Sequence, residues 1–357
     1  MRDLQILADK FAIANTLALH SRGVDRGDYA LLRSAYAPDG EVAYGFFNGP
    51  ADDFARILTG AQRSGPVTLH RTSNIWVQVE DKRARSESYV VAFTETPADQ
   101  GGGQRLIGGR YLDRHARGPD GWKISHRTYV LDWNVNWPGV SAWPEPDDAH
   151  FAPRGGHGMA DAGRVLLAAW SARASQQHGD HRGMNDQDEA TLDTLLSKQA
   201  IHELGMAYCR AVDRGDEEAL RSLFHPDASI VSGVVNGGVD VFAPAMVGLV
   251  TGMLKSSFHS VANEWVKITG DSAVGESYVT AFTLAGEGSS ATQTISGGRY
   301  LDRFDRRNGQ WKFSERVFVM DFNINQPSTA IFDAGPYESL KLRGGFKPLD
   351  PVYMFWN

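Results

Sequence analysis

Cysteine is almost absent from this sequence. Cys209 is the only one among 357 residues, so no disulfide can form within the chain. No apolar run is long enough for a membrane span, and the first residues lack the apolar core of a secretion signal. Lys and Arg are dispersed and the net charge is -7, which gives no basic footprint for nucleic acid or an acidic membrane. We therefore expect a cytoplasmic protein whose partner is a hydrophobic small molecule.

The common motifs for metals, phosphates and cofactors are missing as well. The sequence has no HExxH, no paired CxxC, no phosphate loop and no dinucleotide fingerprint. The stretch from His178 to His181 has no supporting ligand pattern, and we interpret it as solvated linker. We expect neither a metal nor a cofactor, and we interpret Cys209 as a packed small side chain.

The sequence does contain an internal repeat. The motif VDRGD, with Asp25, recurs 188 residues later with Asp213, and GGRYLDR recurs after 189 residues. Slippage of one residue over a whole domain indicates duplication. We predict a first domain over residues 1–150, a tail and linker over 151–190, and a second domain with a C-terminal tail over 191–357.

Each repeat has the same order of expected elements. Apolar residues at helical spacing predict a helix that ends near VDRGD, and a short second helix stops at a Pro-Asp turn where a strand begins. A third short helix, near 53–58 or 241–250, precedes several long strands rich in Val, Thr, Tyr and Phe. Helices followed by an antiparallel meander predict an α+β fold, with the helices packed on one face of a curved, mostly antiparallel sheet.

This pattern of VDRGD between two helices, then GGRYLDR and W-K-[IF]-S, resembles the SnoaL-like domains of the nuclear transport factor 2-like superfamily. The resemblance covers roughly 3 to 137 and 191 to 326, and implies two tandem cone-shaped domains with apolar cavities. Closest in pattern are cofactor-free lyases: scytalone dehydratase, bile acid 7α-dehydratase and lindane dehydrochlorinase. Those enzymes pair an Asp at the end of helix one with a His of a central strand. The matching pairs are Asp25 with His70 and Asp213 with His259.

The resemblance implies further site residues. An Arg after the W-K-[IF]-S strand matches Arg127 and Arg316, and a Tyr five residues before the Asp matches Tyr208, where domain 1 has His20. In this interpretation the His is a base oriented by the Asp. Tyr208 or His20 then protonates or hydrogen-bonds the departing oxygen, and the Arg stabilises a developing anion.

Each assignment has a structural alternative. The Asp of each pair can be an N-cap for the following helix. Arg127 and Arg316 can pair with the sheet carboxylates Asp113 and Asp302. The histidines can be structural, and Tyr208 can be an ordinary residue of an amphipathic helix.

The last strand of each repeat offers candidate substrate-binding residues. DWNVNW and DFNINQ alternate polar and apolar residues, so Asn134 and Asn323 are candidates to hydrogen-bond a substrate from the inner face. Pairing with a neighbouring loop is the alternative. Trp133 and Phe322 would suit an aromatic or polycyclic ligand, or fill the core. A bulge can shift strand parity, which leaves these orientations open. We interpret GGRYLDR as architectural, with its Arg and Asp on the outer face.

The function expected from these residues is a cofactor-independent lyase. It would abstract a proton and eliminate a leaving group from a hydrophobic, aromatic or polycyclic small molecule. An isomerase with the same base and a non-catalytic binding module are alternatives, as is one working copy beside one scaffold copy. By analogy with the fold, the repeats can form an internal pseudo-dimer, and the chain can form a homo-oligomer.

Overall fold

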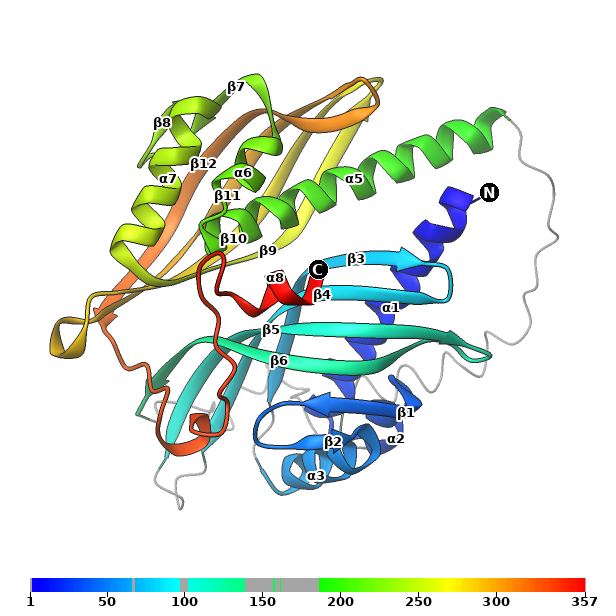
Figure 1. The fold of residues 1–357 in the computed structure, drawn as a ribbon, viewed down its shortest axis with the longest axis vertical. Coiled ribbons are helices and arrows are strands. Elements are labelled where there is room, and N and C mark those ends of the chain that lie inside the picture. The colour runs from blue at the N-terminus through cyan, green and yellow to red at the C-terminus, as the bar shows by residue number, and fades with distance from the viewer. Residues whose placement is uncertain are drawn as a thin grey trace, which may run out of the picture.

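The computed structural model describes residues 2–65, 68–96, 102–138, 157, 161 and 186–356. They form two α+β domains with the same order of elements (Figure 1). The predicted linker over 151–190, including His178 to His181, lies almost wholly outside the described residues.

The elements of domain 1 follow the predicted order, with helices before the long strands. They are α1 (Arg2–Asp25), α2 (Tyr29–Ser34), β1 (Tyr36–Ala43), β2 (Asn48–Pro50), α3 (Ala51–Ser64), β3 (Leu69–Glu80), β4 (Arg83–Thr96), β5 (Gly103–Gly118) and β6 (Gly121–Trp137).

Domain 2 repeats this series and then continues into a tail. Its elements are α5 (Asp186–Arg214), α6 (Glu217–Ser222), β7 (Phe224–Val231), β8 (Asn236–Gly238), α7 (Val239–Met253), β9 (Leu254–Thr269), β10 (Ser272–Ala285), η4 (Gly288–Ser290), β11 (Thr292–Arg307), β12 (Gln310–Pro327), η5 (Gly335–Tyr337) and α8 (Pro351–Trp356).

Within the described residues each domain forms one six-stranded sheet. The orders are β2-β1-β6-β5-β4-β3 and β8-β7-β12-β11-β10-β9. All neighbours are antiparallel except β1 with β6 and β7 with β12, which are parallel. The α+β prediction is confirmed, including tandem domains with helices packed on mostly antiparallel sheets. The Pro-Asp turn predicted after the second helix is wrong in detail, because Pro38 and Asp39 lie inside β1 at an irregularity of its pairing.

The VDRGD motif explains how the first helix ends and the second begins. Gly27 and Gly215 have φ of 56° and 63°, a left-handed conformation that suits glycine after a helix. The following Asp28 and Asp216 then cap α2 and α6 by accepting from the backbone N–H of Leu31 and Ala219.

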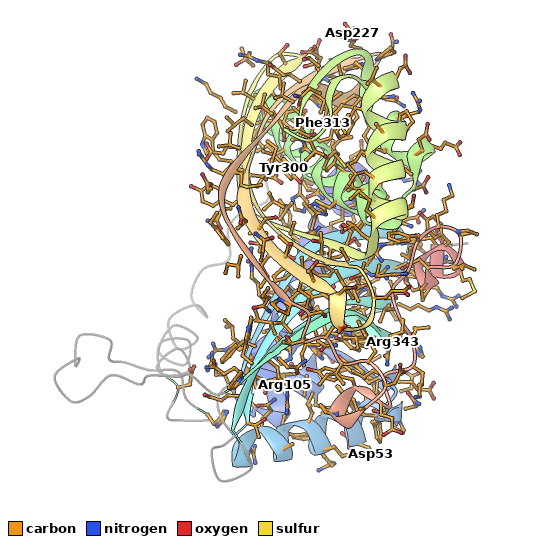
Figure 2. All side chains as sticks on the ribbon, turned by 90° about the vertical axis from the view of Figure 1, so that its left-hand side faces the viewer. Asp53, Arg105, Asp227, Tyr300, Phe313 and Arg343 are labelled. Atoms are coloured by element: carbon orange, nitrogen blue, oxygen red, sulfur yellow. The ribbon has the colours of Figure 1, made fainter. Side chains whose placement is uncertain are left out.

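The two interiors are packed differently. In domain 2 one continuous cluster of buried apolar side chains joins the sheet to α5, α6 and α7. Figure 2 shows Tyr300 and Phe313 within this layer. Domain 1 has a smaller main cluster that includes Tyr36, Tyr44 and Phe54. The main buried cluster is therefore larger in domain 2 than in domain 1.

The tail after β12, residues 328–356, packs on domain 1 and also contacts domain 2, where Lys347 N–H donates to Arg214 O at 2.7 Å (Figure 1). Leu131 of β6 donates to Leu342 O and accepts from Gly344 N, both at 3.0 Å. The tail thus continues the sheet beyond the end of β1. At Gly344 a Cβ would lie 1.7 Å from Asp132 Oδ1, so only glycine allows this close approach.

Candidate functional site

Asp25 and His70 are in direct contact in domain 1. His70 Nδ1–H donates to Asp25 Oδ1 at 2.6 Å, and the His70 backbone N–H donates to Oδ2 at 2.8 Å. The Thr68 hydroxyl donates to Oδ1 at 2.8 Å. The carboxylate therefore holds the imidazole in one tautomer and leaves Nε2 free of this contact.

Domain 2 repeats this geometry. His259 Nδ1–H donates to Asp213 Oδ1 at 2.6 Å and its backbone N–H to Oδ2 at 2.8 Å, while Ser257 replaces the Thr. Burial alone would raise the pKa of Asp213, but the adjacent His259 and Arg214 outweigh it and lower the pKa. Since Asp28 and Asp216 cap the following helices, the N-cap alternative does not hold for Asp25 and Asp213.

A cavity of about 780 Å³ adjoins the pair of domain 1. Its wall is predominantly apolar and comes from α1, α3, the inner face of the sheet and the C-terminal tail. His70 reaches it from β3 and His20 from α1. A cavity of this size and polarity is typical of a small-molecule site. Its lining includes Val24, Tyr44, Leu58, Val90, Ile107, Tyr111, Tyr129 and, from the tail, Gly335, Glu338, Leu340 and Lys341.

His20 is a buried polar group in this cavity. Its side chain is 1% exposed, and neither ring nitrogen has a hydrogen-bond partner among the described residues. Burial, together with the charge of Arg127, holds its pKa well below the usual value, so the ring is neutral near pH 7. A neutral imidazole offers one donor and one acceptor to a ligand.

Arg127 lies behind the cavity wall rather than in it. Its Nε and Nη2 donate to the two oxygens of Asp113 at 2.8 and 2.7 Å. Nη1 has no partner among the described residues. The predicted direct contact with a substrate anion is not what the geometry shows, because the Asp113 alternative holds the guanidinium. Asp113 therefore points inward, which corrects the prediction that it faces outward with Arg110.

Domain 2 has the same ion pair in a more crowded setting. Arg316 donates to both oxygens of Asp302 at 2.7 Å. Its guanidinium lies 4.0 Å from the Tyr208 ring centre and 4.1 Å from that of Phe313. A gap of about 10 Å³ lies beside Arg316 and Asp302, at positions whose domain 1 counterparts do not line the large cavity. Tyr208 is buried, and burial raises the pKa of its hydroxyl to about 12.

Three repeat positions explain the crowding beside Arg316. The repeat positions of Tyr36, His115 and Ile124 carry Phe224, Phe304 and Phe313 in domain 2. Phe313 stacks against the other two with ring centres 5.0 Å apart. Domain 2 thus has three phenylalanine rings where domain 1 has a tyrosine, an imidazole and an isoleucine.

The predicted substrate residues of the last strands lie elsewhere. A bulge makes Leu131 oppose Gly109 and Trp133 oppose Gly108, so Trp133 turns to the outer face. There it stacks on Phe282 of domain 2, with ring centres 3.8 Å apart. Phe322, at the same bulge in domain 2, is 49% exposed and covers Gly297. Neither ring lines the described cavity.

The two asparagines also have structural partners. Asn134 opposes Ile107, which lines the cavity, so its inward parity was predicted correctly. Its amide, however, donates to Ile331 O at 2.7 Å, and its oxygen accepts from Ile331 N at 2.9 Å. The loop alternative therefore holds for Asn134. Asn323 is exposed and accepts from Asn325 Nδ2 at 2.7 Å.

Comparison of the two repeats did not identify Tyr44 or the C-terminal tail as parts of the site. Tyr44 lines the cavity, stacks on Tyr129 with centres 5.4 Å apart, and its hydroxyl has no partner among the described residues. Burial raises the pKa of this hydroxyl against the opposing charge of Arg127. Ser232 occupies the repeat position of Tyr44 in domain 2, so searching for residues shared by both copies could not find it.

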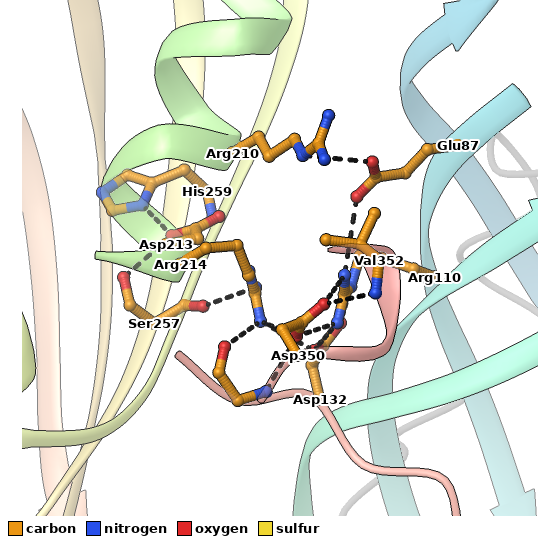
Figure 3. A network of polar contacts seen from close by, with 11 residues as sticks. Glu87, Arg110, Asp132, Arg210, Asp213, Arg214, Ser257, His259, Asp350 and Val352 are labelled. Carbon is orange, nitrogen blue, oxygen red and sulfur yellow. Dashed lines mark hydrogen bonds and ion pairs between the residues drawn. The ribbon is translucent and has the colours of Figure 1, made fainter. Parts of the chain in front are cut away.

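A buried ion network fixes the tail on domain 1. Arg110 donates to both oxygens of Asp132, at 2.9 and 3.0 Å, and to both oxygens of Asp350, at 2.8 and 2.7 Å. Arg214 of domain 2 reaches Asp350 at 3.0 Å. Figure 3 shows Asp350 between the two arginines. The network therefore joins domain 1, domain 2 and the tail.

No group of three or more His, Cys, Asp or Glu among the described residues is placed to hold a metal ion. None of the described helices combines the length and apolarity needed to cross a membrane.

A model of the SnoaL-like domain matches the chain twice, over residues 5–128 and 193–317. The chain belongs to the SnoaL-like domain family. Two solved structures from Novosphingobium species are similar to it. A proposed scytalone dehydratase from Novosphingobium aromaticivorans is 22% identical, covering 41% of this chain and 99% of that chain, with a TM-score of 0.35. A hexachlorocyclohexane dehydrochlorinase from Novosphingobium barchaimii is 25% identical, with coverages of 41% and 99% and a TM-score of 0.36. No curated protein matches the chain significantly.

Proposed function

We propose that domain 1 is a cofactor-independent lyase for a hydrophobic small molecule, with Asp25 and His70 as its base. The observation that carries this proposal is that His70 contacts Asp25 at 2.6 Å and also lines an apolar cavity of about 780 Å³. A base oriented by a carboxylate and shielded by apolar walls suits removal of a proton from carbon.

The proposed step is an elimination. His70 Nε2 takes a proton from a carbon, the C–H electron pair forms the new C=C bond, and the leaving group departs from the neighbouring carbon with its bonding pair. Asp25 stabilises the imidazolium that results. If hydroxide leaves, the N–H of His20 or the hydroxyl of Tyr44 supplies its proton and regains one from the His70 imidazolium, and the products are an alkene and water.

Arg127 acts in this proposal as a positioning residue. Its contact with Asp113 keeps a positive charge behind His20 and Tyr44, and that charge favours the neutral form of His20. The cavity aromatics Tyr44, Tyr111 and Tyr129 suit a cyclic or aromatic substrate.

Product analysis tests the reaction class. The chain is incubated with a panel of hydroxylated and halogenated cyclic compounds, and mass spectrometry follows loss of water or halide. Loss of such a fragment supports a lyase. A product of unchanged mass identifies the isomerase alternative, which the same base allows, and binding without turnover identifies a non-catalytic module.

Two matched variants then locate the activity. His70→Ala should abolish turnover, whereas His259→Ala, which removes the same contacts from domain 2, should retain it. Thermal unfolding checks that both variants fold. Equal losses in the two variants would contradict the assignment to domain 1, and no loss in either would remove His70 as the base.

A further inference from the structure

The two domains meet through two different sets of side chains. Trp133 and Tyr89 of domain 1 stack on Phe282 and Phe258 of domain 2, with ring centres 3.8 and 4.7 Å apart. We call the domain 1 set patch A: Glu87, Tyr89, Arg110, Asp132, Trp133 and Val135. The domain 2 set is patch B: Arg210, Arg214, Phe258, Phe282 and Ile295.

Each patch occurs a second time in the chain. At the repeat spacing of 188 or 189 residues, aromatic, acidic and basic positions of patch A keep their type, and so do the two arginines of patch B. The second patch A, on domain 2, is Glu276, Tyr278, Arg299, Asp321, Phe322 and Ile324. The second patch B, on domain 1, is Arg22, Arg26, Leu69, Phe93 and Leu106, of which Leu106 also packs against the internal contact.

The two copies of patch A differ sharply in exposure. Tyr89 and Trp133 are each 2% exposed, whereas Tyr278 and Phe322 are each 49% exposed. Val135 is 1% exposed and its counterpart Ile324 is 50% exposed. A contiguous exposed apolar surface of this kind marks an interaction site. Met320 and Trp265 enlarge it, at 56% and 60% exposed.

We infer that patch A of domain 2 binds patch B of domain 1 from a second copy of this chain. The contact between the two domains is heterologous, and a heterologous contact leaves one unused surface of each kind. In this contact between copies, Leu69, which is 58% exposed, would take the place that Phe258 has in the internal contact.

Charge complementarity supports the same pairing. In the internal contact Arg214 pairs with Asp132 at 3.3 Å and Arg210 with Glu87 at 3.5 Å. Between copies, Arg22 and Arg26 of patch B would face Glu276 and Asp321. These two arginines already contact a carboxylate, that of Asp161, at 3.1 and 3.3 Å.

Sedimentation velocity of the full chain over a wide concentration range tests the proposal. The wild type should form species heavier than the 39.1 kDa monomer. Phe322→Glu in patch A and Leu69→Glu in patch B should each abolish them. Leu349→Glu is the matched control, because Leu349 is 86% exposed and lies outside both patches. Circular dichroism checks folding, and Ile324→Glu and Arg22→Glu serve as second variants of each patch.

Mixing the two variants distinguishes this contact from a symmetric one. Phe322→Glu keeps an intact patch B and Leu69→Glu an intact patch A, so their mixture should form a species of two chains and stop there. A wild type that is monomeric at every concentration would overturn the proposal. Assembly that survives Leu69→Glu, or a mixture that stays monomeric, would overturn it too.

Discussion

Domains 1 and 2 contain the same Asp-His and Arg-Asp pairs at nearly identical distances, yet their surroundings differ. In domain 1 the pair adjoins a cavity that the C-terminal tail helps to enclose. In domain 2 phenylalanines pack together near Arg316, and Ser232 occupies the repeat position of the cavity residue Tyr44. The comparison teaches that the dyad alone does not define a site, because duplication preserved it while the walls around it diverged.

The largest difference between the copies should be the loss of turnover when the Asp of each dyad is replaced by Asn. Asp25→Asn removes the charge that stabilises the imidazolium, and should lower turnover by about 10²- to 10⁴-fold. Asp213→Asn makes the same change in domain 2 and should leave turnover within about twofold. Steady-state kinetics of both variants measure this contrast. Comparable losses would show two working sites.

The ion pairs on the outer faces of the two sheets should contribute unequally to the free energy of unfolding. Asp132→Ala leaves buried charge on Arg110 and Arg214, and should lower the free energy of unfolding by about 3 kcal/mol. Its counterpart Asp321 is 46% exposed and pairs with Arg299 at 3.0 Å, so Asp321→Ala should cost under about 1 kcal/mol. Urea unfolding followed by tryptophan fluorescence gives both values. Equal costs would mean that burial of the network contributes little.

The interiors of the two domains should contribute differently to the pH dependence of stability, because domain 1 has a buried histidine, His115, where domain 2 has Phe304. Burial lowers the pKa of His115 to about 4, whereas the unfolded chain titrates near 6.5. As pH falls from 6.5 to 4 the unfolded state binds the proton first, so stability should fall by up to about 1.4 kcal/mol per pH unit.

His115→Phe, which copies Phe304 of domain 2, should make this slope shallower. His20, whose pKa is also lowered, should supply the remainder. Urea midpoints across this pH range test the effect, and an unchanged slope in the variant would exclude His115 as its source.

The smallest effect should be on ligand affinity, when the part of the cavity wall that the C-terminal tail provides is trimmed. Leu340→Ala removes apolar surface from the cavity, and should weaken binding of an apolar ligand by about 1 kcal/mol, or roughly fivefold. Leu349→Ala, in the same tail but 86% exposed, should leave affinity unchanged. Isothermal titration with a ligand found in the turnover panel compares the two. Identical affinities would place the ligand away from the tail.

Local signals made much of the fold and the dyad predictable. VDRGD ends a helix and caps the next one through its own short-range contacts, and both copies repeat it. Asp25 and His70 were identified through the resemblance to SnoaL-like lyases, and the recurrence of both residues in the second copy supported the pair. The ion pair of Arg127 with Asp113 was foreseen as an alternative, since the two residues oppose each other on neighbouring strands.

Long-range packing made the rest unpredictable. The bulge beside Gly108 reverses the side to which Trp133 points. The two glycines permit such a bulge, but they do not show which residue of the neighbouring strand is the extra one. The Asn134 amide donates to the backbone of Ile331, which lies 197 residues further along the chain. Tyr44 was overlooked because the copies differ there. Comparing repeats detects what the domains share and hides what makes one of them distinct.

A crystal structure of the chain with a bound substrate analogue tests the central claim most directly. The account predicts the analogue in domain 1, with its reacting carbon beside His70 Nε2, its polar group near His20 and Tyr44, and Leu340 covering it. An analogue bound equally beside His259, or bound in domain 1 away from His70, would contradict the account.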